Sequence, residues 1–200
     1  MNRNQLKDKH NFFNSTLFRL KTVLLTGNRF FKNSLLPPKK FIDNNQLTGK
    51  PIIAFSESDL WNPFDNKENW ILTAGKIQNL RIATKKLNGI EIKANEVFSF
   101  WRHIGNPNLL KGFVIGREIR EGCIIPTVAG GLCQISNALY DAALKANFDI
   151  IERHKHTQVI KGSLSEQDRD ATVKWNYIDL RFKSNFDFRI SWAYIIDRTF

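Results

Sequence analysis

The chain has 200 residues, of which 42% are hydrophobic and 24% are charged. This length suggests one domain with an extension, and the apolar content excludes a disordered or fibrous protein. Lysine and arginine exceed the acids by 11. Residues 1–50 hold ten basic and two acidic residues, a net +8. The aromatic residues alternate as core residues do, so no specific nucleic-acid recognition is expected from this charge.

Residues 1–40 are predicted to be a basic N-terminal extension with an amphipathic helix over residues 12–25 and a linker of two prolines. Gly27 and Asn28 are expected to end that helix. A basic, aromatic helix suits peripheral contact with an anionic membrane, and docking of its apolar face on the domain is the alternative. The sequence shows no convincing signal peptide or membrane-spanning run, which predicts a protein that is cytoplasmic or peripheral to the cytoplasmic membrane.

Residues 41–68 are expected to connect the extension to a domain of residues 69–200. Helical periodicity predicts helices over residues 69–87 and 132–146, with short glycine-punctuated strands between them. Alternation predicts longer antiparallel strands at residues 150–160, 170–182 and 186–196. The expected fold class is α+β, in which a cysteine-bearing helix packs with short strands and a C-terminal antiparallel sheet.

Cys133 is the first candidate for chemistry, because it stands at the start of the second predicted helix. Unpaired backbone N–H groups and the positive end of the helix dipole favour a thiolate there. Gly130 and Gly131 allow other groups to approach closely, and Gln134 adds a polar neighbour. At about 100° per residue, Cys133 lies roughly 140° from the centre of the apolar stripe, so it is predicted to face a cleft. The alternative is a small buried hydrophobic residue.

His154 and His156 are predicted to share one face of a strand, and Asp170 begins the next predicted strand. One imidazole could deprotonate the Cys133 thiol while the carboxylate orients that imidazole. In a plainer interpretation the histidines are half-exposed polar residues and the aspartate caps a turn. A metal site at Cys133, His154 and His156 is a further alternative, although no paired-cysteine signature supports it. No cofactor is expected.

Several short motifs occur in order between about residues 69 and 190. They are NLRIA at 79–83, EVFSF at 96–100, GGLCQIS at 130–136, LYDAA at 139–143, ERHKH at 152–156, DATV at 170–173 and DLRF at 179–182. Together they resemble the VanW-like family. The chain departs from the family pattern at Ala129, Asn137 and Thr157, where glycine, threonine and serine are more usual.

The resemblance implies an association with the cell envelope and with glycopeptide resistance, but no established biochemical activity. We expect a cysteine-dependent hydrolase or acyltransferase for a cell-wall peptide or amide related to peptidoglycan. In that hypothesis Cys133 is the nucleophile, His156, the better family match of the two histidines, is the base, and Asp170 orients it. The predicted binding residues are Gly130, Gly131, Gln134, Arg153 and His154. A non-catalytic binding or accessory module using the same groove, or the metal site, remains the alternative.

Overall fold

The computed structural model describes residues 12–35, 37–61, 67–120, 123–156 and 168–194. The chain divides into two compact units, residues 1–37 and 38–200. The first unit contains one long helix, α1 (Phe12–Leu35). The predicted end of this helix at Gly27 was wrong, because a glycine inside a helix costs only about 1 kcal/mol and the neighbouring residues continue the helical pattern. In the part of the chain described, no helix is both long and apolar enough to cross a membrane.

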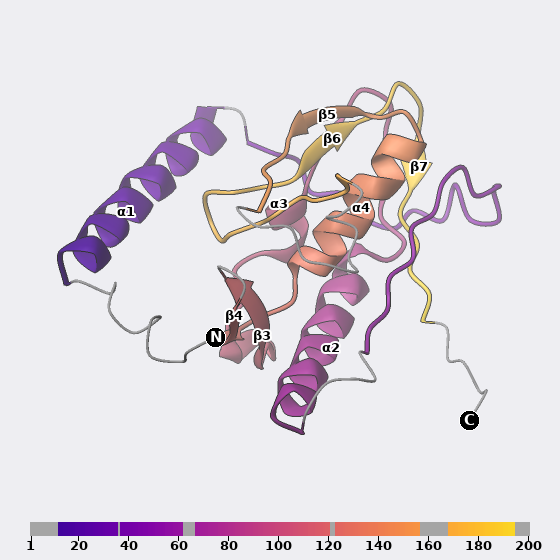
Figure 1. The fold of residues 1–200 in the computed structure, drawn as a ribbon. Helices are drawn as coiled ribbons and strands as arrows, with labels where there is room; N and C mark the ends of the chain where they lie inside the picture. Colours follow the sequence, from indigo (N-terminus) through magenta and orange to yellow (C-terminus); the bar gives the residue numbers. More distant parts are fainter. Residues whose placement is uncertain (1–11, 36, 62–66, 121–122, 157–167, 195–200) are drawn as a thin grey trace. The chain divides into compact units, whose positions relative to one another are not determined.

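The second unit is α+β, as predicted (Figure 1). Its helical segments are α2 (Lys67–Leu87), α3 (Phe100–Ile104), the 3₁₀ turn η2 (Leu109–Lys111) and α4 (Cys133–Lys145). Its strands are β1 (Glu91–Ile92), β2 (Val97–Ser99), β3 (Ile115–Arg120), β4 (Cys123–Val128), β5 (Asp149–Glu152), β6 (Arg181–Lys183) and β7 (Phe188–Arg189). The helices α2 and α4 therefore confirm the periodicity prediction to within two residues at each end.

The described strands pair antiparallel in three small sheets, with the orders β2-β6-β5, β1-β7 and β3-β4. Phe182 of β6 lies opposite Phe98 of β2 and Ile150 of β5, so β6 is the central strand of its sheet. The strands of the C-terminal sheet are much shorter than predicted. The backbone of Ala171 bonds instead to side chains of α4, which removes the ladder that a strand over 170–182 would need.

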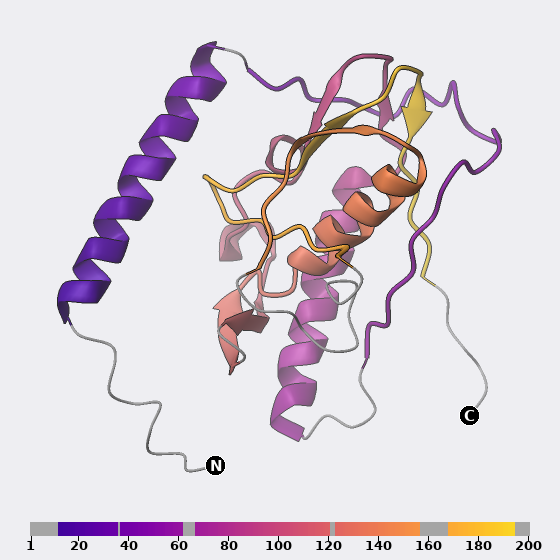
Figure 2. The same cartoon turned by 45° about the horizontal axis from the view of Figure 1, so that its top comes forward.

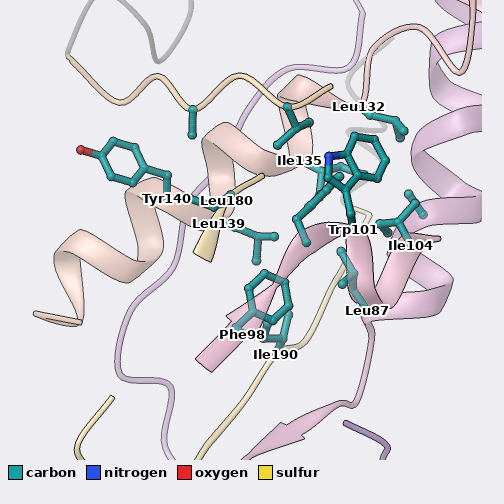
Figure 3. Packing of buried hydrophobic residues seen from close by; sticks show 14 of the residues in the cluster. Leu87, Phe98, Trp101, Ile104, Leu132, Ile135, Leu139, Tyr140, Leu180 and Ile190 are labelled. Carbon is teal, nitrogen blue, oxygen red and sulfur yellow. The ribbon is translucent and has the colours of Figure 1, made fainter. Parts of the chain in front are cut away.

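The hydrophobic core lies between the helices and the short sheets. Figure 3 shows Leu139 of α4, Phe98 of β2 and Leu87 of α2 within this cluster. The rings of Phe98 and Phe182 stack with centroids 4.6 Å apart. Burial of each such side chain contributes about 1.5–3 kcal/mol, so the rings hold the short strands where backbone pairing alone would not.

The β3–β4 hairpin lies against α2, as two viewing directions show (Figures 1 and 2). Glycines make this approach possible. A Cβ at Gly75 of α2 would meet the carbonyl oxygen of Ile115 at 2.0 Å, and a Cβ at Gly130 would meet the carbonyl oxygen of Gly116 at 2.5 Å. The fully buried Asn79 bridges the same contact, because its amide donates to the carbonyls of Val114 and Gly130, each at 3.0 Å.

The substitution Gly75→Ala is expected to destabilise the protein, although alanine is the better helix former by about 1 kcal/mol. The added methyl group would collide with backbone rather than with a movable side chain. We expect a loss of about 1–3 kcal/mol in the free energy of unfolding, measured by urea denaturation.

Gln78→Ala, at an exposed position of the same helix, is the matched control and should be neutral or slightly stabilising. A stability gain from Gly75→Ala would contradict the close contact between α2 and the hairpin.

Candidate functional site

Cys133 is the first residue of α4 and is half-buried. The turn before it is closed by the backbone N–H of Gln134, which donates to the carbonyl of Gly131 at 3.0 Å. The sulfur lies 3.7 Å from the Thr172 hydroxyl and 3.8 Å from the carbonyl oxygen of Val173. The thiol therefore faces the 170–173 segment rather than the centre of the core.

Two polar side chains of α4 hold the 170–173 segment beside the thiol. The Ser136 hydroxyl donates to the carbonyl of Ala171 at 2.5 Å, and the Asn137 side-chain oxygen accepts from the Ala171 N–H at 2.8 Å. The next backbone N–H, of Thr172, donates to the carbonyl of His154 at 2.8 Å. These bonds bring the chain after β5 and the chain around Asp170 to the start of α4.

His156 lies against Asp170 through two hydrogen bonds of 2.5 Å each. One joins its Nδ1 to one carboxylate oxygen, and in the other its backbone N–H donates to the second oxygen. The hydrogen bond to Asp170, and after it the hydrogen bond to Cys133, raise the pKa of His156 to about 10. The structure therefore brings Cys133, His156 and Asp170 into one cluster.

Asp170 is buried, which by itself would raise the pKa of its carboxyl group. The hydrogen bonds from His156 and the positive charges of His156 and Arg153 outweigh burial and lower the pKa. Arg153 also fixes the backbone here, because its Nε donates to the Asp170 carbonyl at 2.6 Å and its guanidinium stacks 4.8 Å over the Tyr140 ring. Arg153, which was predicted as a binding residue, thus holds the backbone that carries the Asp170 carboxylate.

His154 lies apart from this group. Its side chain is 47% exposed and its Nε2 is 3.4 Å from a carboxylate oxygen of Glu152. The predicted shared strand face was wrong, because β5 ends at Glu152 and the two imidazoles take different directions in the irregular chain that follows. Within the described ranges no three histidine, cysteine, aspartate or glutamate side chains gather as a metal site would require, so the metal alternative gains no support.

The glycine pair and Gln134 have roles that their position in the sequence did not indicate. Gly130 provides the close contact with β3, and Gly131 has a φ of 101° with its Cα against the Lys76 side chain. The Gln134 amide donates to the Ser58 hydroxyl at 2.9 Å and to the Asp59 carbonyl at 2.8 Å. It therefore holds the 51–61 segment along α4 instead of pointing at the thiol.

Two departures from the family pattern can be located. Ala129 adopts a φ of 62°, a left-handed conformation that glycine takes without strain, which accounts for the glycine usual there. Asn137 provides the carbonyl oxygen for the Ala171 N–H. The third departure, Thr157, lies outside the described residues. Ser136, Asn137 and Thr172 were missed as parts of the site, although all three stand inside or next to the ordered motifs.

Residues 75–199 match the model of a protein family described as "VanW like protein". This match covers more than half of the chain. The chain belongs to the VanW-like family. No solved structure matches the chain.

Two curated relatives are similar to more than half of this VanW-like chain. The Enterococcus faecalis protein named "Vancomycin B-type resistance protein VanW" is 34% identical over 122 residues, which are 58% of this chain and 44% of that protein. The Bacillus subtilis protein named "Uncharacterized protein YoaR" is 31% identical over 109 residues, which are 54% of this chain and 35% of that protein. The matched region thus spans less than half the length of each relative.

The pairing of His156 with Asp170 should make stability depend on pH. The pKa of His156 is raised in the folded state, so its contribution is fully present below about pH 6.5 and is lost as the pH rises through about 10. The free energy lost on His156→Gln should therefore be largest near pH 6 and should shrink toward pH 10, as measured by urea denaturation across that range.

His154→Gln is the matched control, because it makes the same change at the exposed imidazole beside Glu152. The effect of His154→Gln on the free energy of unfolding should be small over the whole pH range. A His156→Gln effect that does not change with pH would show that His156 is not held protonated by Asp170 and Cys133.

Proposed function

We propose that this VanW-like chain is a cysteine-dependent hydrolase or acyltransferase of the cell envelope that acts on a peptidoglycan-related peptide or amide. The observation that carries the proposal is the position of His156, which is hydrogen-bonded to Asp170 and lies close enough to Cys133 for the sulfur to help raise the pKa of the imidazole. Cysteine enzymes use this order of carboxylate, imidazole and thiol to form the thiolate and to keep the imidazole in place.

In the proposed reaction the Cys133 sulfur attacks the carbonyl carbon of the substrate amide as a thiolate, beside a His156 that already carries the proton at neutral pH. The C–N bond breaks as His156 gives that proton to the leaving nitrogen, which leaves a thioester on the sulfur. Water then releases a carboxylic acid, or a second amine accepts the acyl group. His156 takes the proton of that incoming nucleophile, and the thiolate beside the protonated imidazole is restored.

The backbone N–H of Cys133 is the proposed donor to the oxyanion, because those of Gln134 and Ile135 already donate to the carbonyls of Gly131 and Leu132. The side chain of Gln134 is a less direct candidate, because its amide already donates to Ser58 and Asp59. It would have to leave the 51–61 segment before it could bind a substrate oxygen.

Support for a cell-wall substrate comes from the Enterococcus relative, whose name assigns that protein to vancomycin resistance. Support for an amide or ester bond comes from the chemistry of the three side chains, which serves acyl transfer and needs no metal. The support for the substrate and the support for the reaction are independent, so the two can be tested separately.

A non-catalytic binding or accessory module is the second candidate. It is favoured by the packing of the glycine pair, which Gly116 and Lys76 explain without any ligand. The sulfur also already contacts Thr172 and Val173, as a structural cysteine would. In this hypothesis the same groove holds a cell-wall peptide without breaking a bond.

The two candidates differ in the reactivity of the thiol. If His156 activates Cys133, iodoacetamide should alkylate Cys133 readily at pH 7, and His156→Ala should slow the reaction roughly tenfold because a neighbouring positive charge favours the thiolate. Mass spectrometry of the separate Cys133 and Cys123 peptides measures this, with Cys123 as the internal reference.

His154→Ala is the matched control and should leave the alkylation rate within about twofold. Incubation of the full chain with peptides released from peptidoglycan should then give products of changed mass that are lost in Cys133→Ala and kept in His154→Ala. Slow alkylation that His156→Ala does not change, together with peptide binding that survives Cys133→Ala, would reject the enzyme and leave the binding module.

A further inference from the structure

Six of the exposed apolar side chains described between residues 20 and 35 of α1 lie on one side of the helix. At about 100° per residue they fall within an arc of about 140°. Each of them is between 57% and 70% exposed. They are Leu20, Val23, Leu24, Phe30, Phe31 and Leu35. Six large apolar side chains exposed side by side form a patch of the kind that marks an interaction surface, since scattered single residues would need no explanation.

The charges of α1 are all of one sign. The helix carries Arg19, Lys21, Arg29 and Lys32 and no acidic residue, a net +4. Lys21 and Lys32 follow one edge of the apolar arc, about 40° and 60° beyond Leu35. Lysine in this position can reach along an apolar surface and keep its ammonium group in a polar layer.

We propose that α1 lies in the surface of an anionic membrane, with its apolar arc among the acyl chains and with Lys21 and Lys32 at the headgroups. A lipid surface is favoured over the chain's own second unit by charge, because residues 38–200 hold 23 basic and 18 acidic residues and so are themselves net positive, at +5. A negatively charged headgroup layer is complementary to such a helix, and the apolar arc is the face that such a layer buries.

This inference extends the expected membrane contact of residues 12–25 through the end of the helix at Leu35. Phe30, Phe31 and Leu35 lie beyond Gly27, where the sequence pattern had placed the end of the helix. They supply three of the six side chains in the arc. The longer helix therefore carries the apolar surface well beyond the end that the shorter prediction implied. The inference does not depend on whether Cys133 is catalytic.

The test is sedimentation of the full chain with vesicles of equal parts phosphatidylcholine and phosphatidylglycerol, compared with vesicles of phosphatidylcholine alone. Two adjacent leucines provide a matched pair of variants. Leu24 is in the apolar arc, whereas Leu25 is about 100° away, on the basic side, and is only 39% exposed. Leu24→Glu and Leu25→Glu make the same chemical change and the same change in net charge.

We expect the wild-type chain to sediment with the anionic vesicles and to do so far less with the neutral ones. Leu24→Glu should reduce vesicle binding at least about tenfold, while Leu25→Glu should reduce it by less than about threefold. The double variant Lys21→Gln, Lys32→Gln should lower binding by about fivefold for each charge removed, and the corresponding change to arginine should preserve it. Circular dichroism of each variant checks that the helix is retained.

Three results would overturn the proposal. The first is equal binding to both kinds of vesicle, or no binding by the wild-type chain. The second is an equal loss of vesicle binding for Leu24→Glu and Leu25→Glu with the helix intact, which would mean that the apolar arc contributes no more to binding than the rest of the helix. The third is a Leu24→Glu variant whose second unit melts at a lower temperature while vesicle binding is unchanged, which would place the arc against the protein itself.

Discussion

The geometry of the site depends on the hydrogen bonds that α4 makes with the backbone of Ala171. Ser136 and Asn137 satisfy both polar groups of that buried residue, so neither group is available to a neighbouring strand. Each bond is worth only about 1 kcal/mol net, but leaving either backbone group unpaired would cost about 1–3 kcal/mol. Because α4 carries Cys133 and the bonded segment begins with Asp170, the same bonds that stabilise the fold set the distance between thiol and carboxylate.

Much of the candidate site could be predicted from the sequence, because its residues stand at marked positions. Cys133 follows a glycine pair at a helix start, and His156 and Asp170 belong to ordered motifs. The helices α2 and α4 could be predicted because apolar residues recur at helical spacing along both segments of the sequence. Which histidine meets the thiol could not be derived from a strand pattern, since both histidines lie beyond the end of β5.

The features that the sequence did not predict have a common physical origin. Alternation between residues 170 and 182 suggested a strand, but bonds from side chains to the backbone replace a strand ladder there and leave no periodic signal. The contact of Gln134 with Ser58 joins residues 76 positions apart and likewise follows no local pattern. The glycine pair suggested space for a substrate, whereas the structure fills that space with the backbone of β3. Periodicity along the sequence predicts helices well, and it says little about the contacts between segments that are far apart in the sequence.

The glycine contact between α2 and the hairpin has a consequence for motion. Backbone meets backbone at Gly75, Gly116 and Gly130, and a contact made by backbone has no rotamers through which to relax. The start of α4 should therefore move with α2 and the hairpin as one body on the microsecond scale. The 51–61 segment is held to α4 by side-chain bonds, which can break and re-form without disturbing that joint. Amide exchange should therefore be slow along the glycine joint and fast along the 51–61 segment.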